Sequence, residues 1–169
     1  QIVLVPQSQG IQTIDPLSIN LVASVPTNRR DFFGLQANKN VDFTAVSNQL
    51  SINIKSLPTQ DVPIDFSGAV GDFRLDVDLD RDSVDVNESV SLTVSIRGDG
   101  NINLIKFPEL KFDNELEVYD PNEIDKIKID KNGIGGYIQN EYLIVPRYKG
   151  DYNLKGISFS YFDPKKSKY

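Results

Sequence analysis

Residues 73–97 decide the fold of the chain, and they read FRLDVDLDRDSVDVNESVSLTVSIR. Apolar residues alternate with polar ones from Phe73 to Leu79 and again from Val90 to Ile96. A period of two is typical of a strand with one face in a core and the other in water. Because residues 80–83 between the two runs have the composition of a turn, the stretch predicts two successive strands.

Further short runs of β-type residues follow at similar spacing. They cover residues 103–107, 116–119, 124–129, 137–145 and 151–162, and clusters of Gly, Asn, Asp and Pro separate them. The sequence shows no convincing amphipathic helix. Short strands at this spacing predict an all-β chain with an immunoglobulin-like antiparallel β-sandwich.

The alternation also predicts the apolar core, because residues of one phase of a strand face the same way. The side chains expected in the core are Phe73, Leu75, Val77, Val90, Leu92, Val94, Ile96, Val118, Leu143, Val145, Leu154, Ile157 and Phe159. The pattern is strongest over the first two strands, so we expect residues 73–96 to dominate the core.

The composition excludes several kinds of chemistry. The 169 residues include no Cys and no His, which excludes disulfides, zinc thiolate sites, Cys nucleophiles and the commonest general base. The 24 Asp and Glu residues show no spacing that singles out a catalytic pair. We therefore expect a protein that is not an enzyme and has no cofactor.

Charge is unevenly spread along the chain, whose net charge is −6. Residues 61–130 hold 7 Lys and Arg against 18 Asp and Glu. A net acidic chain without a basic stripe argues against nucleic acid as a partner, because phosphate contacts need clustered Lys and Arg. The acidic segment is typical of a solvated sheet face, and it would also attract cations or basic partners.

The chain repeats part of itself at an offset of 140 residues. Residues 2–10, IVLVPQSQG, align with residues 142–150, YLIVPRYKG, so that Val, Pro and Gly match. The match continues with Ile14 over Leu154 and Leu17 over Ile157. The second copy lies near the end of a domain and the first copy opens the chain, so we expect a tandem repeat whose first copy is truncated.

The repeat predicts the following division. Residues 1–57 would be the C-terminal strands of a first immunoglobulin-like domain, with an inserted, exposed loop at 26–42. Residues 58–72 would be a linker. Residues 73–169 would be the second sandwich, without its last strand. Incomplete sandwiches expose backbone N–H and C=O groups at strand edges, so we also expect self-association through strand edges.

Two groups of residues are candidate sites. Asp76, Asp78, Asp80 and Asp82 recur at every second position, and carboxylate oxygens are the ligands that Ca²⁺ prefers. They also fit an exposed strand face, which the alternation favours.

The second group lies within the expected loop at 26–42. Arg29, Arg30, Phe32 and Phe33 combine two cations with two aromatic rings. Such a tip would contact a membrane surface or a partner protein, unless the two rings fold back onto the sandwich.

Several stretches carry a resemblance to a known family. Residues 65–73, DFSGAVGDF, resemble a signature of the BatD family of oxygen-tolerance or aerotolerance proteins, and residues 116–121, LEVYDP, resemble the same family. Residues 141–147 and 157–164 are similar to it too, as are residues 29–34 and 47–58. One departure is Asn87, where the family usually has Gly; Asn tolerates left-handed backbone, so we expect the turn to persist.

The resemblance implies a bacterial envelope protein with tandem immunoglobulin-like domains in the periplasm. Segments outside this chain would tether it to the inner membrane. Its implied partners are other Bat-type proteins with von Willebrand A-type or tetratricopeptide domains, and no enzymatic activity is implied. The function expected on this basis is a non-enzymatic interaction module that scaffolds a Bat complex linked to oxygen or stress tolerance.

The alternative is a carbohydrate- or cation-binding β-sandwich appended to an envelope enzyme. Carbohydrate binding would use exposed aromatic side chains on one face, and the sequence has no Trp for this. Tyr137, Tyr142, Tyr148, Tyr152 and Tyr161 are the candidates for such a platform, although we expect Tyr142, Tyr152 and Tyr161 to pack within the sandwich.

Overall fold

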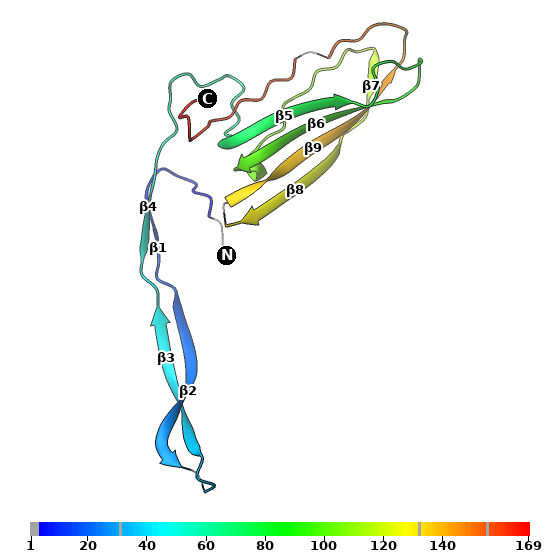
Figure 1. Cartoon of the computed structure of the whole chain (residues 1–169). Helices are drawn as coiled ribbons and strands as arrows, with labels where there is room; N and C mark the ends of the chain where they lie inside the picture. Colours follow the sequence, from blue (N-terminus) through cyan, green and yellow to red (C-terminus); the bar gives the residue numbers. More distant parts are fainter. Residues whose placement is uncertain (1–3, 31, 132, 155) are drawn as a thin grey trace. The chain divides into compact units, whose positions relative to one another are not determined.

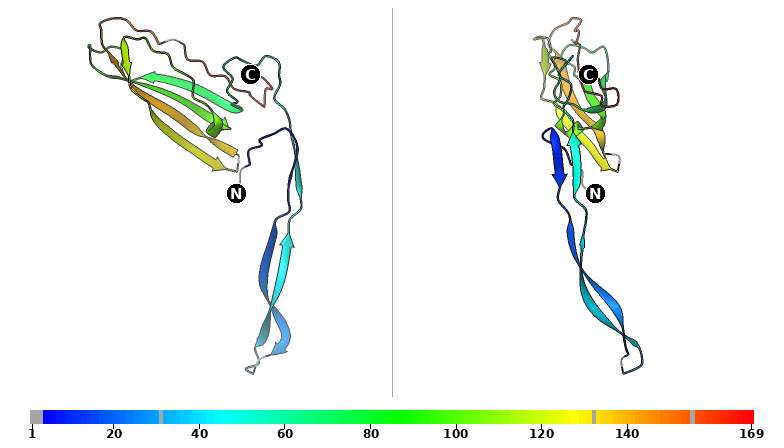
Figure 2. Two further views of the ribbon diagram at one scale, coloured as in Figure 1. Left: turned by 180° about the vertical axis from the view of Figure 1, so that it is seen from behind. Right: turned by 90° about the vertical axis from the view of Figure 1, so that its left-hand side faces the viewer.

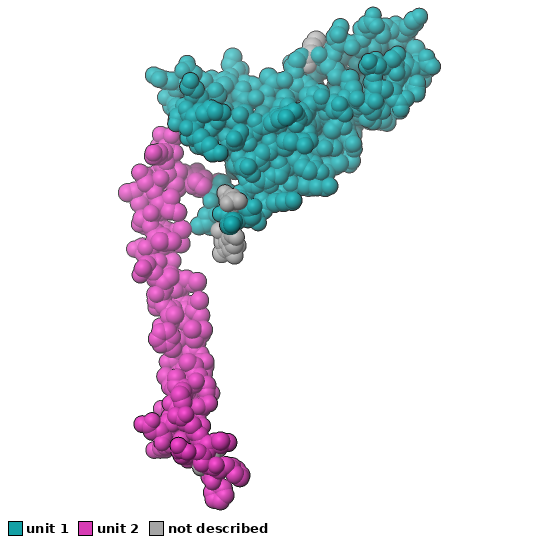
Figure 3. Space-filling model, in the orientation of Figure 1, with its two compact units in different colours: residues 1–5, 57–169 teal, residues 6–56 magenta. Residues whose placement is uncertain are grey.

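The computed structural model describes residues 4–30, 32–131, 133–154 and 156–169. Within these residues the fold is all-β, since it has no α-helix and its named strands pair only in antiparallel fashion. The chain divides into two compact units (Figure 3). We call residues 6–56 the ribbon unit, and residues 57–169 together with Leu4 and Val5 the sheet unit. The predicted all-β antiparallel class is confirmed.

The sheet unit contains one five-stranded sheet (Figure 1). Its strands are β5 (Gly71–Leu79), β6 (Val90–Gly100), β9 (Gly133–Pro146) and β7 (Leu116–Val118), in that order, while β8 (Asn122–Asp130) also pairs with β9. β5 and β6 are the two strands that the alternating stretch predicts. Their register opposes Leu75 to Ile96 and Val77 to Val94, so the apolar phases of both strands share the inner face.

Irregular chain covers this inner face and forms the second layer of the sandwich. The core residues Leu92, Val94 and Ile96 on β6 are fully buried. Side chains from two segments without strands pack on the core, namely Ile105, Phe107, Leu110 and Phe112 from the first and Leu154, Ile157, Phe159 and Tyr161 from the second. A short 3₁₀ turn at Ile102–Leu104 places the fully buried Ile102 beneath the sheet.

The predicted core is largely confirmed, with two errors. Phe73, Leu92, Val94, Ile96 and Val145 are buried, and Leu75, Val90, Val118, Leu154, Ile157 and Phe159 are partly buried against the core. Val77 is wrong, because it lies on the edge strand β5 and remains 46% exposed. Leu143 is also wrong at 42% exposed: it opposes Ser91 on the outer face, while its neighbour Ile144 faces inward.

Two predicted strands do not form. Residues 103–107 continue from the 3₁₀ turn into irregular chain, and residues 151–161 carry no strand in the described part. Their apolar residues nevertheless alternate, because a chain that lies extended over a core must turn alternate side chains inward whether or not its backbone pairs. At the end of the second stretch Phe162 forms an isolated parallel bridge with Val70, beside the start of β5.

The expected linker at 58–72 is partly packed. Ala69 is fully buried in the core, and the Phe66 ring lies 4.8 Å from the Tyr169 ring between centroids. Gly71 begins β5 and donates its backbone N–H to the Phe162 carbonyl at 3.0 Å. The whole expected linker therefore lies in the sheet unit, and from Phe66 onward it packs against other residues of that unit.

The ribbon unit consists of two strand pairs. β1 (Gly10–Ile14) pairs with β4 (Leu50–Ile54), and β2 (Ser18–Arg30) pairs with β3 (Gln36–Val46). The twist of the β2–β3 pair is visible in the blue and cyan segments of Figure 2. No described residue of this unit is fully buried. That residues 1–57 are the last strands of a truncated immunoglobulin-like domain stays a prediction.

The expected loop at 26–42 is wrong, because most of it lies in β2 and β3. Pro26 lacks an N–H and the following residues are polar, which suggested a break in the strand. The ladder is indeed irregular between Pro26 and Arg30, but side chains bridge the gap. Thr27 Oγ1 donates to the Ala37 carbonyl at 2.7 Å, and Gln36 Nε2 donates to the Thr27 carbonyl at 3.2 Å.

Candidate functional site

The four residues predicted as an interaction loop lie at the end of the β2–β3 pair. Arg29 and Arg30 end β2, and Phe32 and Phe33 follow in the turn. Phe32 is 99% exposed and Phe33 84% exposed, and their rings meet edge to face with centroids 5.7 Å apart. Arg30 Nη1 donates to the Gly34 carbonyl at 3.0 Å, across the turn that holds the two rings. We call these four residues the tip.

The four aspartates of the calcium hypothesis follow one another along β5 and the turn after it. Asp76 lies between two arginines, with its carboxylate 2.5 Å from Arg74 Nε and 3.2 Å from Arg97 Nε. Asp80 accepts the Ser91 backbone N–H at 2.9 Å and is 3.4 Å from Arg81 Nε. Within the described residues no group of three or more acidic side chains converges on one point, so the calcium hypothesis gains no support.

A row of charged and aromatic side chains crosses the outer face of the sheet. Arg74, Arg97, Tyr137 and Lys126 are successive partners on β5, β6, β9 and β8. The Arg97 guanidinium lies 5.8 Å from the centroid of the Tyr137 ring, and Lys126 Nζ lies 5.7 Å from it. Both cations lie near this ring, so a sugar that stacked on Tyr137 would compete with them for its faces.

The other candidate tyrosines do not form a platform with Tyr137. Tyr142 packs against Phe112 and Tyr161 against Phe73, on the inner side of the sheet, as expected. Tyr152 donates its hydroxyl to the Tyr148 carbonyl at 2.8 Å. The Tyr148 residue remains 66% exposed.

An arginine that sequence reasoning did not single out joins three segments of the sheet unit. Arg147, directly after β9, donates from Nε and Nη2 to the Glu117 carboxylate on β7. Its Nη1 donates to Asn87 Oδ1 at 2.8 Å. Asn87 has a φ of 68°, which confirms that the turn keeps left-handed backbone with Asn in place of Gly. Glu117, Arg147 and Asn87 lie at positions that the family resemblance picks out, but no spacing rule in the sequence predicts contacts across 30 and 60 positions.

The electrostatics of this cluster follow from its hydrogen bonds. The Tyr119 hydroxyl donates to Glu117 Oε1 at 2.8 Å. This bond, together with Arg147, holds the pKa of Glu117 below its ordinary value. The same contact raises the pKa of the Tyr119 hydroxyl, because the carboxylate disfavours a second negative charge. The cluster therefore acts as a structural clasp between β7, β9 and the turn at Asn87.

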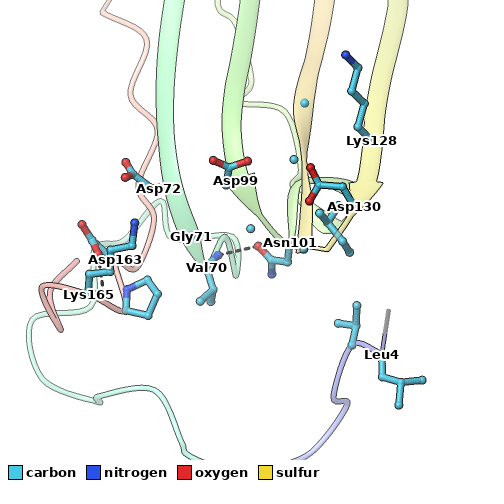
Figure 4. Close-up of a pocket in the computed structure, with 17 residues that line it drawn as sticks. Leu4, Val70, Gly71, Asp72, Asp99, Asn101, Lys128, Asp130, Asp163 and Lys165 are labelled. Atoms are coloured by element: carbon cyan, nitrogen blue, oxygen red, sulfur yellow. Dashed lines mark hydrogen bonds between the residues drawn. The ribbon is translucent and has the colours of Figure 1, made fainter. Parts of the chain in front are cut away.

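A pocket of about 660 Å³ lies at the end of the sheet where β5 and β9 begin (Figure 4). The charged residues that line it are Asp72, Asp99, Lys128, Asp130, Asp163 and Lys165, and its lining also includes Gly71, Gly100, Gly133, Gly135 and Gly136. The glycines at 133, 135 and 136 belong to the β8–β9 hairpin, and no helix follows them as a phosphate loop would require. The side-chain amide of Asn101 makes two hydrogen bonds to the backbone. Its Oδ1 accepts from the Val70 N–H at 2.7 Å, and its Nδ2 donates to the Gly68 carbonyl at 2.9 Å.

Asp163 is the buried carboxylate of this pocket, at 5% exposure. Its oxygens accept the Lys165 and Lys166 backbone N–H groups at 2.8 and 3.1 Å, and Lys166 Nζ lies 2.9 Å away. The bonds from Lys166, first of all the one from its side chain, lower the pKa of Asp163 from the ordinary value of 3.8. The carboxylate thus stabilises the last turn of the chain through bonds within residues 163–166.

This geometry predicts the pH dependence of stability. The pKa is lowered on folding, so the contribution of Asp163 is complete above pH about 4 and is lost as the pH falls through the folded value. We expect Asp163→Asn to lower the urea midpoint at pH 7 and to differ little from the wild type near pH 2. A matched control is Asp82→Asn in the exposed turn, which should behave as the wild type at both pH values. An equal difference between Asp163→Asn and the wild type at pH 7 and pH 2 would contradict the assignment.

The fold and these surfaces define an all-β module of the immunoglobulin-like type. Residues 77–169 match the family model described as BatD DUF11 like domain. The chain belongs to the BatD family, as the motifs in its sequence predicted, and it is thus a Bat-family envelope protein. This family is not known to be enzymatic. The comparisons with curated proteins and with solved structures gave no match. No helix in the described residues is long and apolar enough to cross a membrane.

Proposed function

We propose that the chain is a non-enzymatic interaction module of the bacterial envelope, anchored at the inner membrane through segments outside the chain, which scaffolds a Bat complex linked to oxygen or stress tolerance. The observation that carries this proposal is the tip, where Phe32 and Phe33 are 99% and 84% exposed. Paired aromatic rings beside arginines are the residue types that supply most binding energy at protein interfaces. Membership of the BatD family supports the envelope location.

The partners we propose are Bat-type proteins with von Willebrand A-type or tetratricopeptide domains. Arg29 and Arg30 come shortly before the two rings in the sequence, so the partner surface should combine an apolar pocket with acidic groups near it. The arginines would steer the encounter, and burial of the rings would hold the complex together.

The test is recovery of partners by the full-length anchored protein from its own envelope, with the variant Phe32→Ser/Phe33→Ser beside the wild type. We expect the wild type to recover von Willebrand A-type or tetratricopeptide proteins, and the variant to recover at least about tenfold less, because truncated aromatic anchors cost more than 1.4 kcal/mol. The matched control is Val22→Ser/Val46→Ser, which removes two exposed apolar side chains from the ribbon away from the tip.

Equal recovery by the wild type and the tip variant would reject the tip as the binding site. Recovery of glycan without Bat-type proteins would reject the proposed function itself. Liposome sedimentation of the same variants distinguishes the membrane from a protein partner: loss of sedimentation on Phe32→Ser/Phe33→Ser would assign the tip to the lipid surface.

A further inference from the structure

One face of the β2–β3 pair is apolar over most of its length. Directly opposed residues of an antiparallel pair point to the same side, and the register opposes Ile19 to Ala45, Leu21 to Phe43 and Ala23 to Val41. We call this side the ribbon face, and its apolar residues are Ile19, Leu21, Ala23, Val25, Val41, Phe43 and Ala45. Lys39 opposes Val25 on the same side, at the end of the face nearest the tip. The opposite side is mostly polar: Thr44 there donates to Asn20 Oδ1 at 2.9 Å, and Ser24 opposes Asn40.

The ribbon face is uncovered in the described part of the chain. Phe43 is 59% exposed, Leu21 49% and Ile19 47%, and β2 and β3 form a sheet of two strands. A two-stranded ribbon alone is marginally stable in water, and a third strand or a packed layer normally stabilises it. The regular separation of apolar and polar sides therefore points to a second layer that covers the ribbon face.

We propose that this second layer is the ribbon face of another copy of the chain, packed face to face about a two-fold axis. The large pair Leu21 and Phe43 is followed directly by the small pair Ala23 and Val41. The two-fold axis would lie in the plane of the contact, at right angles to the strands and midway between these two pairs. It sets Leu21 of one copy over Ala23 of the other. The same axis sets Phe43 over Val41, so large side chains meet small ones at the centre of the contact.

Charge selects the antiparallel arrangement of the two copies. Arg29, Arg30 and Lys39 gather toward the tip, while the middle of the ribbon face carries no charge. Parallel copies would place the two cationic tips side by side, and the antiparallel pair sets them at opposite ends. Asp42 points to the polar side and stays in water.

The area of the contact sets its strength. Faces of this size bury on the order of 1,000 Å² in total, near the lower limit of specific interfaces. We therefore expect a weak dimer with a dissociation constant of about 10–100 µM. The association is distinct from binding of a Bat-type partner at the tip, because the ribbon face contains no tip residue.

The first experiment measures the mass of the 169-residue chain by sedimentation equilibrium over about 1–300 µM, a range that brackets the expected constant. We expect a monomer–dimer equilibrium for the wild type and an association constant at least tenfold lower for Leu21→Ser/Phe43→Ser. The matched control is Asn20→Ser/Thr44→Ser on the polar side, which should dimerise as the wild type. A monomeric wild type over the whole range overturns the proposal, as does equal weakening by both double variants.

The second experiment tests which residues of the two copies face each other. It replaces a large side chain in only one of the two partners. The chain has no Cys, so single cysteines report unambiguously. Packed sheets lie about 10 Å apart, which suits a short bis-maleimide and is too far for a direct disulfide. A mixture of Leu21→Cys and Ala23→Cys chains should cross-link strongly, and Val22→Cys on the polar side should not. Cross-linking of Val22→Cys as strong as that of the Leu21→Cys and Ala23→Cys mixture overturns the proposal. A monomeric chain in which the amides of β2 and β3 are protected from hydrogen exchange overturns it too.

Discussion

Leu92→Ala is expected to lower the free energy of unfolding of the sheet unit by about 3–4 kcal/mol. Leu92 is fully buried and lies on β6, which has β5 on one side and β9 on the other. It packs with Val94 and Ile144 in one of the two core clusters. Neighbours on both strands hold their positions through the ladder, so the cavity left by Ala would not collapse. Urea unfolding followed by far-ultraviolet circular dichroism gives the difference directly.

The control for this prediction is Val77→Ala on the same side of the sheet. Val77 opposes Val94 but lies on the edge strand and is 46% exposed, so its truncation should cost less than about 1 kcal/mol. If Leu92→Ala and Val77→Ala shifted the midpoint equally, burial would not govern stability as the structure indicates.

The comparison of Leu92 with Val77 shows which part of the core the sequence can predict. Alternation in residues 73–96 gave the two strands and their shared apolar face, because a period of two leaves only one phase to bury. The same rule failed at residues 142–145, where four consecutive apolar residues offer both phases. There the register with β6 decides, and it turns Ile144 inward and Leu143 outward.

The irregular second layer over the sheet and the β2–β3 pair escaped prediction, and the reason is a different one. Residues 103–107 and 151–161 have β-type patterns, but a strand also needs a neighbour to pair with, and the sequence does not show whether one exists. Conversely, Pro26 and the polar residues after it suggested a loop. The bonds of Thr27 and Gln36 across the ribbon replace the missing ladder contacts, and such side-chain geometry is not visible in composition.

The candidate site was partly visible in the sequence. The residue types of the tip were identifiable, since Arg29, Arg30, Phe32 and Phe33 follow one another closely, while their exposure came only from the structure. The ribbon face depends on pairing Leu21 with Phe43 across 22 positions, and the Arg147 clasp on pairing across 30 and 60. Such long-range partners follow from topology rather than from local pattern.

Gly98→Ala is the second substitution with a large expected effect, a loss of about 2–4 kcal/mol from combined backbone strain and overlap. Gly98 lies within β6 opposite Phe73, with a φ of 153° that side chains rarely adopt. A Cβ there would lie 2.0 Å from the Asp72 carbonyl oxygen and 2.9 Å from the Phe73 Cα. Both atoms are backbone of β5, so relief would require breaking the β5–β6 ladder, and we expect a lower urea midpoint together with faster amide exchange in β5.

Gly150→Ala is the matched control for this prediction, because it adds the same methyl group where there is room. The nearest atom to its Cβ position is Tyr152 Cζ at 3.7 Å, an ordinary contact, and Gly150 has no positive φ. Its substitution should leave stability within about 0.5 kcal/mol of the wild type or raise it slightly, since Ala restricts the unfolded chain more than Gly does. A Gly98→Ala variant as stable as Gly150→Ala would mean that β5 and β6 lie farther apart at Phe73 than the ladder indicates. The pairing of β5 with β6 beside the Phe73 ring would then not depend on the close approach of Gly98 to the Asp72 carbonyl.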